Sequence, residues 1–343
     1  MTWNDFFQSV KAGKLDRVYL FTGPEEWIKR EAVEALRAKL LPPGLEQLND
    51  ASLEEVTAQQ IIDAAETLPM MCERRMVVVR DWAPLLPGKS KNEETETEQL
   101  DKWMANPPES CVTVFYMRTE PDGRKKAVSL LKKRATLVSF DALTDSELGK
   151  WVAGRLKPLG KRMGAPALNA LSFMAGHDLT RLAGELDKLT AYVGDRTEIA
   201  ESDVREIVSA SLEYNVFELL NRLLSGKLDE AQHMVNTLLQ GGQTAIGILA
   251  MLTRQLRQLA HMRYALDAGE SVENIQTTLQ MHPYAARKTA QQCRSRTAAD
   301  FRDLYEQCVS ADYDIKSGRL RDSMALDAIL LKIAMPKLAT KRN

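Results

Sequence analysis

The spacing of apolar residues divides the chain into two parts. In residues 1–141, short apolar runs rich in β-branched and aromatic residues alternate with longer segments whose apolar residues recur every three or four positions. The short runs predict buried strands, and the longer segments predict helices. The expected strands are residues 18–21, 45–48, 76–79, 112–117 and 136–140. Because strands that alternate with helices favour a parallel sheet, this part is expected to be an α/β domain.

The helices expected in this part begin with an amphipathic segment near the N-terminus and otherwise fall between the strands. They are residues 3–10, 27–40, 58–68, 95–104 and 125–133. Pro69 ends the third of them, because proline cannot continue a helix. A polar, acid-rich stretch, residues 89–98, is expected to be a surface loop, and no function is assigned to it.

Beyond residue 141 the strand pattern does not return, and the sequence predicts helices only. Residues 142–210 are expected to form a small domain of three short helices with a tail from Ser202, and residues 211–343 a larger helical domain. In the larger domain a long helix after Gly242 carries leucines mostly three or four residues apart, which predicts a packing seam. The seam consists of Leu249, Leu252, Leu256, Leu259 and Leu266.

Composition and charge narrow the class of protein. The chain has 343 residues with 46 Lys+Arg and 47 Asp+Glu, so its net charge of −1 predicts no strong affinity for nucleic acid or membranes from bulk charge alone. Its four cysteines include no C-x-x-C pair, which fits free thiols in a reducing compartment. The N-terminus lacks the features of a signal peptide, and no apolar run is long enough to span a bilayer. We therefore expect a soluble, cytoplasmic protein without a membrane partner.

A strand, a glycine turn and a helix follow one another at residues 18–40, which is the setting of a phosphate-binding loop. A working loop has the pattern G-x-x-x-x-G-K-[ST], in which the second glycine lets the backbone approach the phosphates and the hydroxyl binds Mg²⁺. Here Gly23 is followed, after four residues, by Ile28, Lys29 and Arg30. The second glycine and the hydroxyl are missing, and Lys29 is expected to be a solvent-exposed helix lysine. The sequence predicts a degenerate loop that holds no nucleotide cofactor.

Other catalytic chemistry is also missing from the sequence. The strand at 76–79 is followed by Arg80, Asp81 and Trp82 rather than by the Asp-Glu pair typical of nucleotide hydrolysis. The four histidines are far apart in sequence and show no metal-ligand spacing with cysteine or glutamate. We therefore expect neither a catalytic residue nor a metal site.

Met70 and Met71 are two adjacent large apolar residues in a connection, after Leu68 and Pro69 and before the strand at 76–79. Consecutive residues point in different directions, so one core is not expected to bury both. Two interpretations stay open from the residues alone. The pair is either a hydrophobic cap on the edge of the sheet, or an exposed apolar pair that inserts into a pocket of another protein.

A set of motifs, in order along nearly the whole chain, resembles the delta subunits of bacterial DNA polymerase III, which are the clamp-opening subunits of its clamp loader. The motifs lie at residues 19–26, 68–79, 178–189, 213–219 and 314–318. The resemblance implies an AAA+-type fold of three parts. These are an α/β domain at 1–141, a helical lid domain at 142–210 and a helical collar domain at 211–343, and the collar would join the other loader subunits in a ring.

The resemblance also implies a role without ATP binding or hydrolysis, in which the methionine pair inserts into a pocket on the beta sliding clamp. The implied contact residues are Leu68, Pro69, Met70, Met71 and Arg74. Glu73, Arg74 and Arg75 would form the polar rim of this contact. For the two arginines, a structural role is an equal alternative. The implied partners are the sliding clamp, the gamma/tau ATPase, the delta-prime subunit and primed DNA within the assembled loader, which belongs to the DNA polymerase III holoenzyme.

Two other functions are weighed against this one. An active P-loop ATPase is disfavoured by the missing loop residues, and a DNA-binding helical module receives little support from the weak net charge. The basic residues that such a module would use are Arg254, Arg257, Arg287, Lys288, Arg294 and Arg296.

Overall fold

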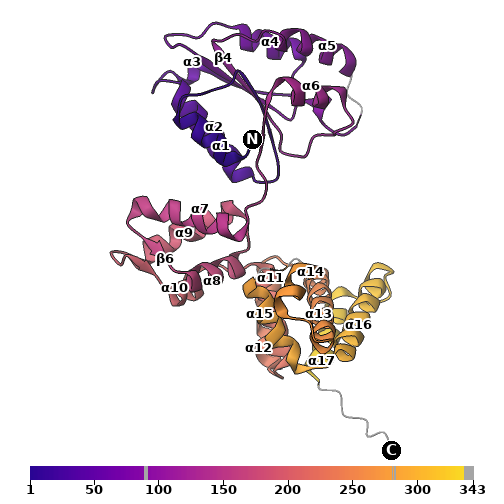
Figure 1. Cartoon of the computed structure of the whole chain (residues 1–343). Helices are drawn as coiled ribbons and strands as arrows, with labels where there is room; N and C mark the ends of the chain where they lie inside the picture. Colours follow the sequence, from indigo (N-terminus) through magenta and orange to yellow (C-terminus); the bar gives the residue numbers. More distant parts are fainter. Residues whose placement is uncertain (89–91, 280, 282, 336–343) are drawn as a thin grey trace, which may run out of the picture. The chain divides into compact units, whose positions relative to one another are not determined.

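The computed structural model describes residues 1–88, 92–279, 281 and 283–335 of the chain (Figure 1). The chain separates into two compact units, Met1–Thr144 and Asp145–Asn343. The first boundary predicted from sequence, after residue 141, lies close to this division. The second, after residue 210, falls inside the second unit.

The first unit is built around a five-stranded parallel sheet with the strand order β2-β3-β4-β1-β5. The strands are β1 (Val18–Thr22), β2 (Asp50–Glu54), β3 (Arg75–Arg80), β4 (Cys111–Tyr116) and β5 (Thr136–Ser139). Each neighbouring pair runs parallel. The fold class is therefore confirmed as an AAA+-type α/β sheet domain joined to a part that is mostly helical.

Helices cover both faces of this sheet. They are α1 (Trp3–Lys11), α2 (Glu26–Leu40), α3 (Glu46–Asn49), α4 (Ala58–Glu66), α5 (Glu93–Met104) and α6 (Lys126–Arg134), with a short 3₁₀ turn at Ala83–Leu85. Figure 1 shows α1 and α2 on one side of the sheet and α4, α5 and α6 on the other. The three central strands are buried on both faces, as their continuous apolar sequences predict.

Two predictions of secondary structure in the first unit are wrong. Residues 45–48 do not form a strand, because Leu45 precedes α3 and the strand β2 begins only at Asp50. β2 is an edge strand of mostly polar, partly exposed residues, so it carries no apolar run to reveal it. The acid-rich stretch is not a loop from Glu93 onward, because its glutamates form the first turns of α5, where acidic side chains are favoured. Residues 89–91 of that stretch lie outside the described residues.

The first half of the second unit contains four helices and a very small sheet. The helices are α7 (Asp145–Leu156), α8 (Ala165–Ala175), α9 (Leu179–Val193) and α10 (Glu201–Ile207), with a 3₁₀ turn at Lys157–Leu159. β6 (Arg162–Met163) and β7 (Glu198–Ile199) pair in parallel. The prediction gave three helices and a tail from Ser202, so it did not identify α10 as a fourth helix. The prediction of no further strands missed the two-residue pairing of β6 with β7.

The second half of this unit is wholly helical in the residues that the structure describes. Its helices are α11 (Leu212–Leu224), α12 (Leu228–Gln240), α13 (Ala245–Asp267), α14 (Val272–Leu279), α15 (Pro283–Gln292), α16 (Ala298–Lys316) and α17 (Asp322–Ala334), with a 3₁₀ turn at Cys293–Ser295. The seam on α13 is confirmed from Leu249 to Leu259, whose leucines lie inside the core cluster. Leu266 is only partly buried at its edge. The helix α14 was not anticipated.

Candidate functional site

The connection between α4 and β3 exposes three large apolar side chains. Leu68, Met70 and Met71 are 76%, 55% and 84% exposed, whereas Pro69 and Arg74 are half-buried. The expected exposure of the methionine pair is therefore observed. A hydrophobic cap on the sheet does not fit Met71, because a side chain with that exposure covers almost nothing.

The backbone of this connection is held in an unusual conformation. Met71 has φ 58°, in the left-handed region that a methionine rarely adopts. Immediately before it, both backbone polar groups of Met70 bond to the side chain of Asn49: the N–H donates to Oδ1 at 2.7 Å, and the carbonyl accepts from Nδ2 at 2.9 Å. The two exposed side chains thus project from a turn whose main chain is fixed.

The two arginines beside the pair differ in role. Arg75 is buried, and its Nη1 donates to the carbonyl of Thr67 at 3.2 Å, which ties the end of α4 to the start of β3. Arg75 is therefore structural rather than part of a polar rim. Arg74 is half-buried and Glu73 is exposed, and both follow the methionines within three residues along the chain.

The loop after β1 is closed against the chain that leaves β5. Gly23 has φ 107°, and a Cβ atom there would lie 2.4 Å from the carbonyl oxygen of Phe140. The N–H of Glu25 donates to that same oxygen at 3.0 Å, and the N–H of Phe140 donates to Thr22 at 2.8 Å. Gly23 is thus required for a close approach of two backbone segments. A loop amide that could face a phosphate is instead bonded to the protein.

Lys29 is not the exposed helix lysine that the sequence predicted. It is fully buried, and its Nζ donates to the carbonyl of Met117 at 2.6 Å and forms an ion pair with Glu26. The ammonium also lies 5.2 Å from the centre of the Tyr116 ring. The prediction failed because two of the groups that permit burial, the Met117 carbonyl and the Tyr116 ring, come from the end of β4, far away in sequence.

Other residues near this loop also make contacts within the protein. Ile28 is a core residue, and Arg30 is exposed. The Tyr116 hydroxyl donates to Glu26 Oε2 at 2.7 Å, and burial together with this carboxylate raises the pKa of Tyr116. The lysine at the phosphate-binding position therefore belongs to an internal network with Glu26, Tyr116 and Met117.

Asp81, the acidic residue after β3, is likewise structural. Its Oδ1 accepts from the N–H of Arg118 at 2.8 Å, and its Oδ2 forms an ion pair with the Arg118 side chain at 2.6 Å. Arg118 also bonds to Glu54 at 2.6 Å. Through Asp81 and Glu54, Arg118 links the ends of the three neighbouring strands β2, β3 and β4. Among the described residues there is no group of three or more His, Cys, Asp or Glu side chains that could hold a metal ion.

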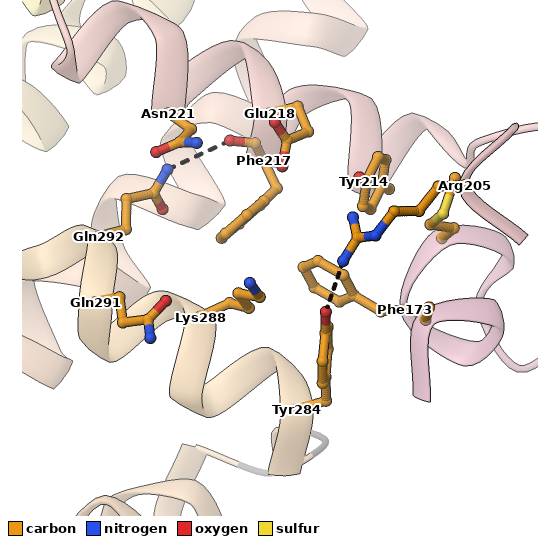
Figure 2. Close-up of a pocket in the computed structure, with 12 residues that line it drawn as sticks. Phe173, Arg205, Tyr214, Phe217, Glu218, Asn221, Tyr284, Lys288, Gln291 and Gln292 are labelled. Carbon is orange, nitrogen blue, oxygen red and sulfur yellow. Dashed lines mark hydrogen bonds between the residues drawn. The ribbon is translucent and has the colours of Figure 1, made fainter. Parts of the chain in front are cut away.

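A cavity of about 200 Å³ lies among helices of the second unit (Figure 2). Phe173 packs edge-on against Tyr214, Phe217 and Tyr284, with ring centres 5.1–5.3 Å apart. Arg205 donates to the Tyr284 hydroxyl at 3.2 Å. These contacts join α8 and α10 to α11 and α15. No nucleophile with an adjacent base occurs among its lining residues, all of which the structure describes, so the cavity suggests no reaction.

The basic residues considered for DNA binding differ in their contacts within the protein. Arg296 donates to the carbonyls of Ile333 and Met335 at the end of α17, which is a structural helix-end contact. The Lys288 ammonium lies 5.5 Å from the Tyr284 ring, and Arg254 forms an ion pair with Glu213 at 3.6 Å. Arg257, Arg287 and Arg294 are exposed. Half of the set therefore has contacts within the protein.

In the described part of the chain, no helix is both long and apolar enough to cross a bilayer.

Known proteins match most of this chain. Two family models match, "DNA polymerase III, delta subunit" over residues 19–141 and "DNA polymerase III delta subunit, C-terminal domain" over residues 213–333. The DNA polymerase III subunit delta of Bacillus subtilis (strain 168) is 30% identical over 334 residues, which cover 96% of each chain. The corresponding subunit of Escherichia coli (strain K12) is 22% identical over 252 residues, which cover 73% of this chain and 71% of that one.

A solved structure gives the same relationship. The Bacillus subtilis DNA clamp loader delta protein matches with a TM-score of 0.59 and 29% identity, over 97% of this chain and 99% of that chain. The relatives of the present chain are thus named as delta subunits, and the solved structure that matches it is named as a clamp loader protein. The resemblance seen in the sequence motifs is confirmed, and the chain belongs to the DNA polymerase III delta-subunit family.

Proposed function

We propose that this chain is the clamp-opening subunit of a DNA polymerase III clamp loader. In this role it binds the beta sliding clamp through Met70 and Met71 and opens the ring for loading onto primed DNA. The observation that carries the proposal is the exposure of this adjacent pair on a fixed turn. Membership of the delta-subunit family supports it.

The energy of opening comes from selective burial. Each methionine buried in a clamp pocket contributes on the order of 1.5–3 kcal/mol. A ligand shifts a closed ring toward an open one only by as much as it binds the open form better. Leu68 extends the apolar surface, and Glu73 and Arg74 form the charged rim around it.

The chain contributes binding rather than hydrolysis in this proposal. Lys29 is used internally, and the Gly23 loop is closed against Phe140. The gamma/tau ATPase and the delta-prime subunit would join it through residues 211–343, with primed DNA inside the assembled loader. We place this role in the cytoplasm, in keeping with four free cysteines.

Clamp opening is tested by comparing two forms of the purified sliding clamp. A variant clamp whose ring interface is broken mimics the open form, since it carries no closure energy. The full chain should bind this form more tightly than the closed ring, by at least roughly tenfold. Titration calorimetry or surface plasmon resonance measures both affinities. Equal affinities would show that the chain binds the clamp but does not open the ring.

The isolated chain should show no measurable affinity for Mg·ATP at micromolar concentration and no ATP hydrolysis. The loop has no second glycine and no Mg²⁺-binding hydroxyl, and its lysine is bonded to Met117. Equilibrium binding of a fluorescent ATP analogue checks this. Saturable micromolar binding would contradict the proposal, and its loss in a folded Lys29→Ala variant would place the nucleotide at this loop.

A further inference from the structure

We propose that Asn49 is a positioning residue that holds the main chain of the methionine pair in its binding-ready conformation. The inference rests on the proposed function, because it concerns how that contact is presented. Asn49 does not touch the clamp in this proposal. It acts through the backbone of Met70.

The Asn49 side chain is a buried amide with every bond directed at backbone. It is the last residue of α3 and is fully buried. Its Nδ2 donates to Leu45 at 3.0 Å and to Met70 at 2.9 Å, and its Oδ1 accepts from the Met70 N–H at 2.7 Å. The side chain therefore pairs with both polar groups of one residue, as a neighbouring strand would.

The hydrogen bonds from Asn49 fix a connection that has no regular backbone hydrogen bonds of its own. Residues 67–74 form neither helix nor strand, so no regular hydrogen-bond ladder fixes them. The next residue, Met71, has φ 58°, which the chain would leave if it were free to relax. By fixing the peptide groups on both sides of the Met70 Cα, Asn49 favours this turn.

The expected benefit is pre-organisation. A flexible turn must lose backbone freedom when it binds, and this cost lowers the affinity. Here the backbone is ordered beforehand by a residue that lies 21 positions earlier. The methionine side chains stay exposed, and they keep the rotational freedom that fits an irregular pocket. Asn49 thus anchors the backbone, whereas the methionine side chains make the contact.

The test uses Asn49→Ala in the full chain, with affinity for the purified sliding clamp as the readout. Loss of the two bonds to Met70 should weaken binding by roughly tenfold. Hydrogen exchange should become faster in residues 67–75, and less so elsewhere in the sheet domain. Thr97→Ala is the matched control, because it also removes a buried polar group that bonds to backbone, at Glu93, in the same unit. That variant should leave clamp affinity unchanged.

A double-mutant cycle separates positioning from general support. In a Met71→Ala background, Asn49→Ala should cost less affinity than it does in the wild type, because the more exposed half of the contact that it positions has been removed. An equal loss in both backgrounds, or unchanged affinity of a folded Asn49→Ala variant, would overturn the inference. If that variant does not fold, the isosteric Asn49→Asp is used instead. It retains the acceptor for the Met70 N–H and places an oxygen against the Met70 carbonyl, so it should also weaken binding and speed exchange at 67–75. A folded Asn49→Asp variant with unchanged affinity and exchange would equally overturn the inference.

The same series keeps failure of the inference distinct from failure of the proposed function. If the variant lacking both methionine side chains binds the clamp like the wild type, the proposed contact is wrong. If that variant loses affinity but Asn49→Ala does not, only the positioning role is wrong.

Discussion

Met70→Ala combined with Met71→Ala should weaken binding to the sliding clamp by roughly two orders of magnitude or more and leave thermal unfolding unchanged. The two side chains are 55% and 84% exposed in the free chain, so their truncation removes little buried area from the fold. In the complex they would be the apolar centre of the contact, where truncations typically cost about 2–4 kcal/mol. Surface plasmon resonance gives the affinity, and circular dichroism gives the melting temperature.

A matched control for the double variant is Met324→Ala. Met324 lies on α17 and is 56% exposed, so this change removes an equally exposed methionine outside the turn. It should leave clamp affinity unchanged. Assembly of the double variant with the other loader subunits should also persist, because that surface is proposed to lie within residues 211–343. Unaltered clamp affinity of the double variant, or a large fall in its melting temperature, would return the pair to a structural role.

The sheet was predictable where strands are buried on both faces. β1, β3 and β4 have continuous apolar sequences, and the structure places all three in the sheet interior. β2 was missed because an edge strand that is partly exposed needs no apolar run. The start of α5 was missed for a related reason. Its first turns carry acidic side chains, which are favoured at the start of a helix by electrostatics that hydrophobic periodicity does not register.

The candidate site was predictable from the sequence only in its exposed part. Two adjacent large apolar residues in a connection stand out without knowledge of the fold. Asn49 gives no comparable signal, because its partner Met70 is brought to it by the pairing of β2 with β3. Lys29 shows the same limit, since its burial depends on the Met117 carbonyl beyond β4. Local sequence identifies side chains that break a pattern, whereas partners distant in sequence require the fold.

Leu256→Asp should unfold the helical core formed by residues 216–333. Leu256 is fully buried on α13, in a cluster with apolar residues of α11, α16 and α17. The change removes its packing and places a carboxylate among the apolar side chains of this cluster. The loss of packing and the burial of an unpaired charge together cost on the order of 4 kcal/mol or more. That is a large fraction of the stability of a typical domain. Loss of helical circular dichroism, or a much lower melting temperature, measures it.

The control for this variant is the neighbouring change Arg257→Asp. Arg257 is exposed on the same helix, so the new carboxylate stays in water and melting should remain close to that of the wild type. The comparison separates burial of a charge from helix propensity, because both variants place aspartate in the middle of α13. A fully folded Leu256→Asp variant that loses only its assembly with other loader subunits would contradict the prediction. The seam would then be a surface between subunits, and the bundle would have to draw its stability from the leucines of α11 and α17 instead.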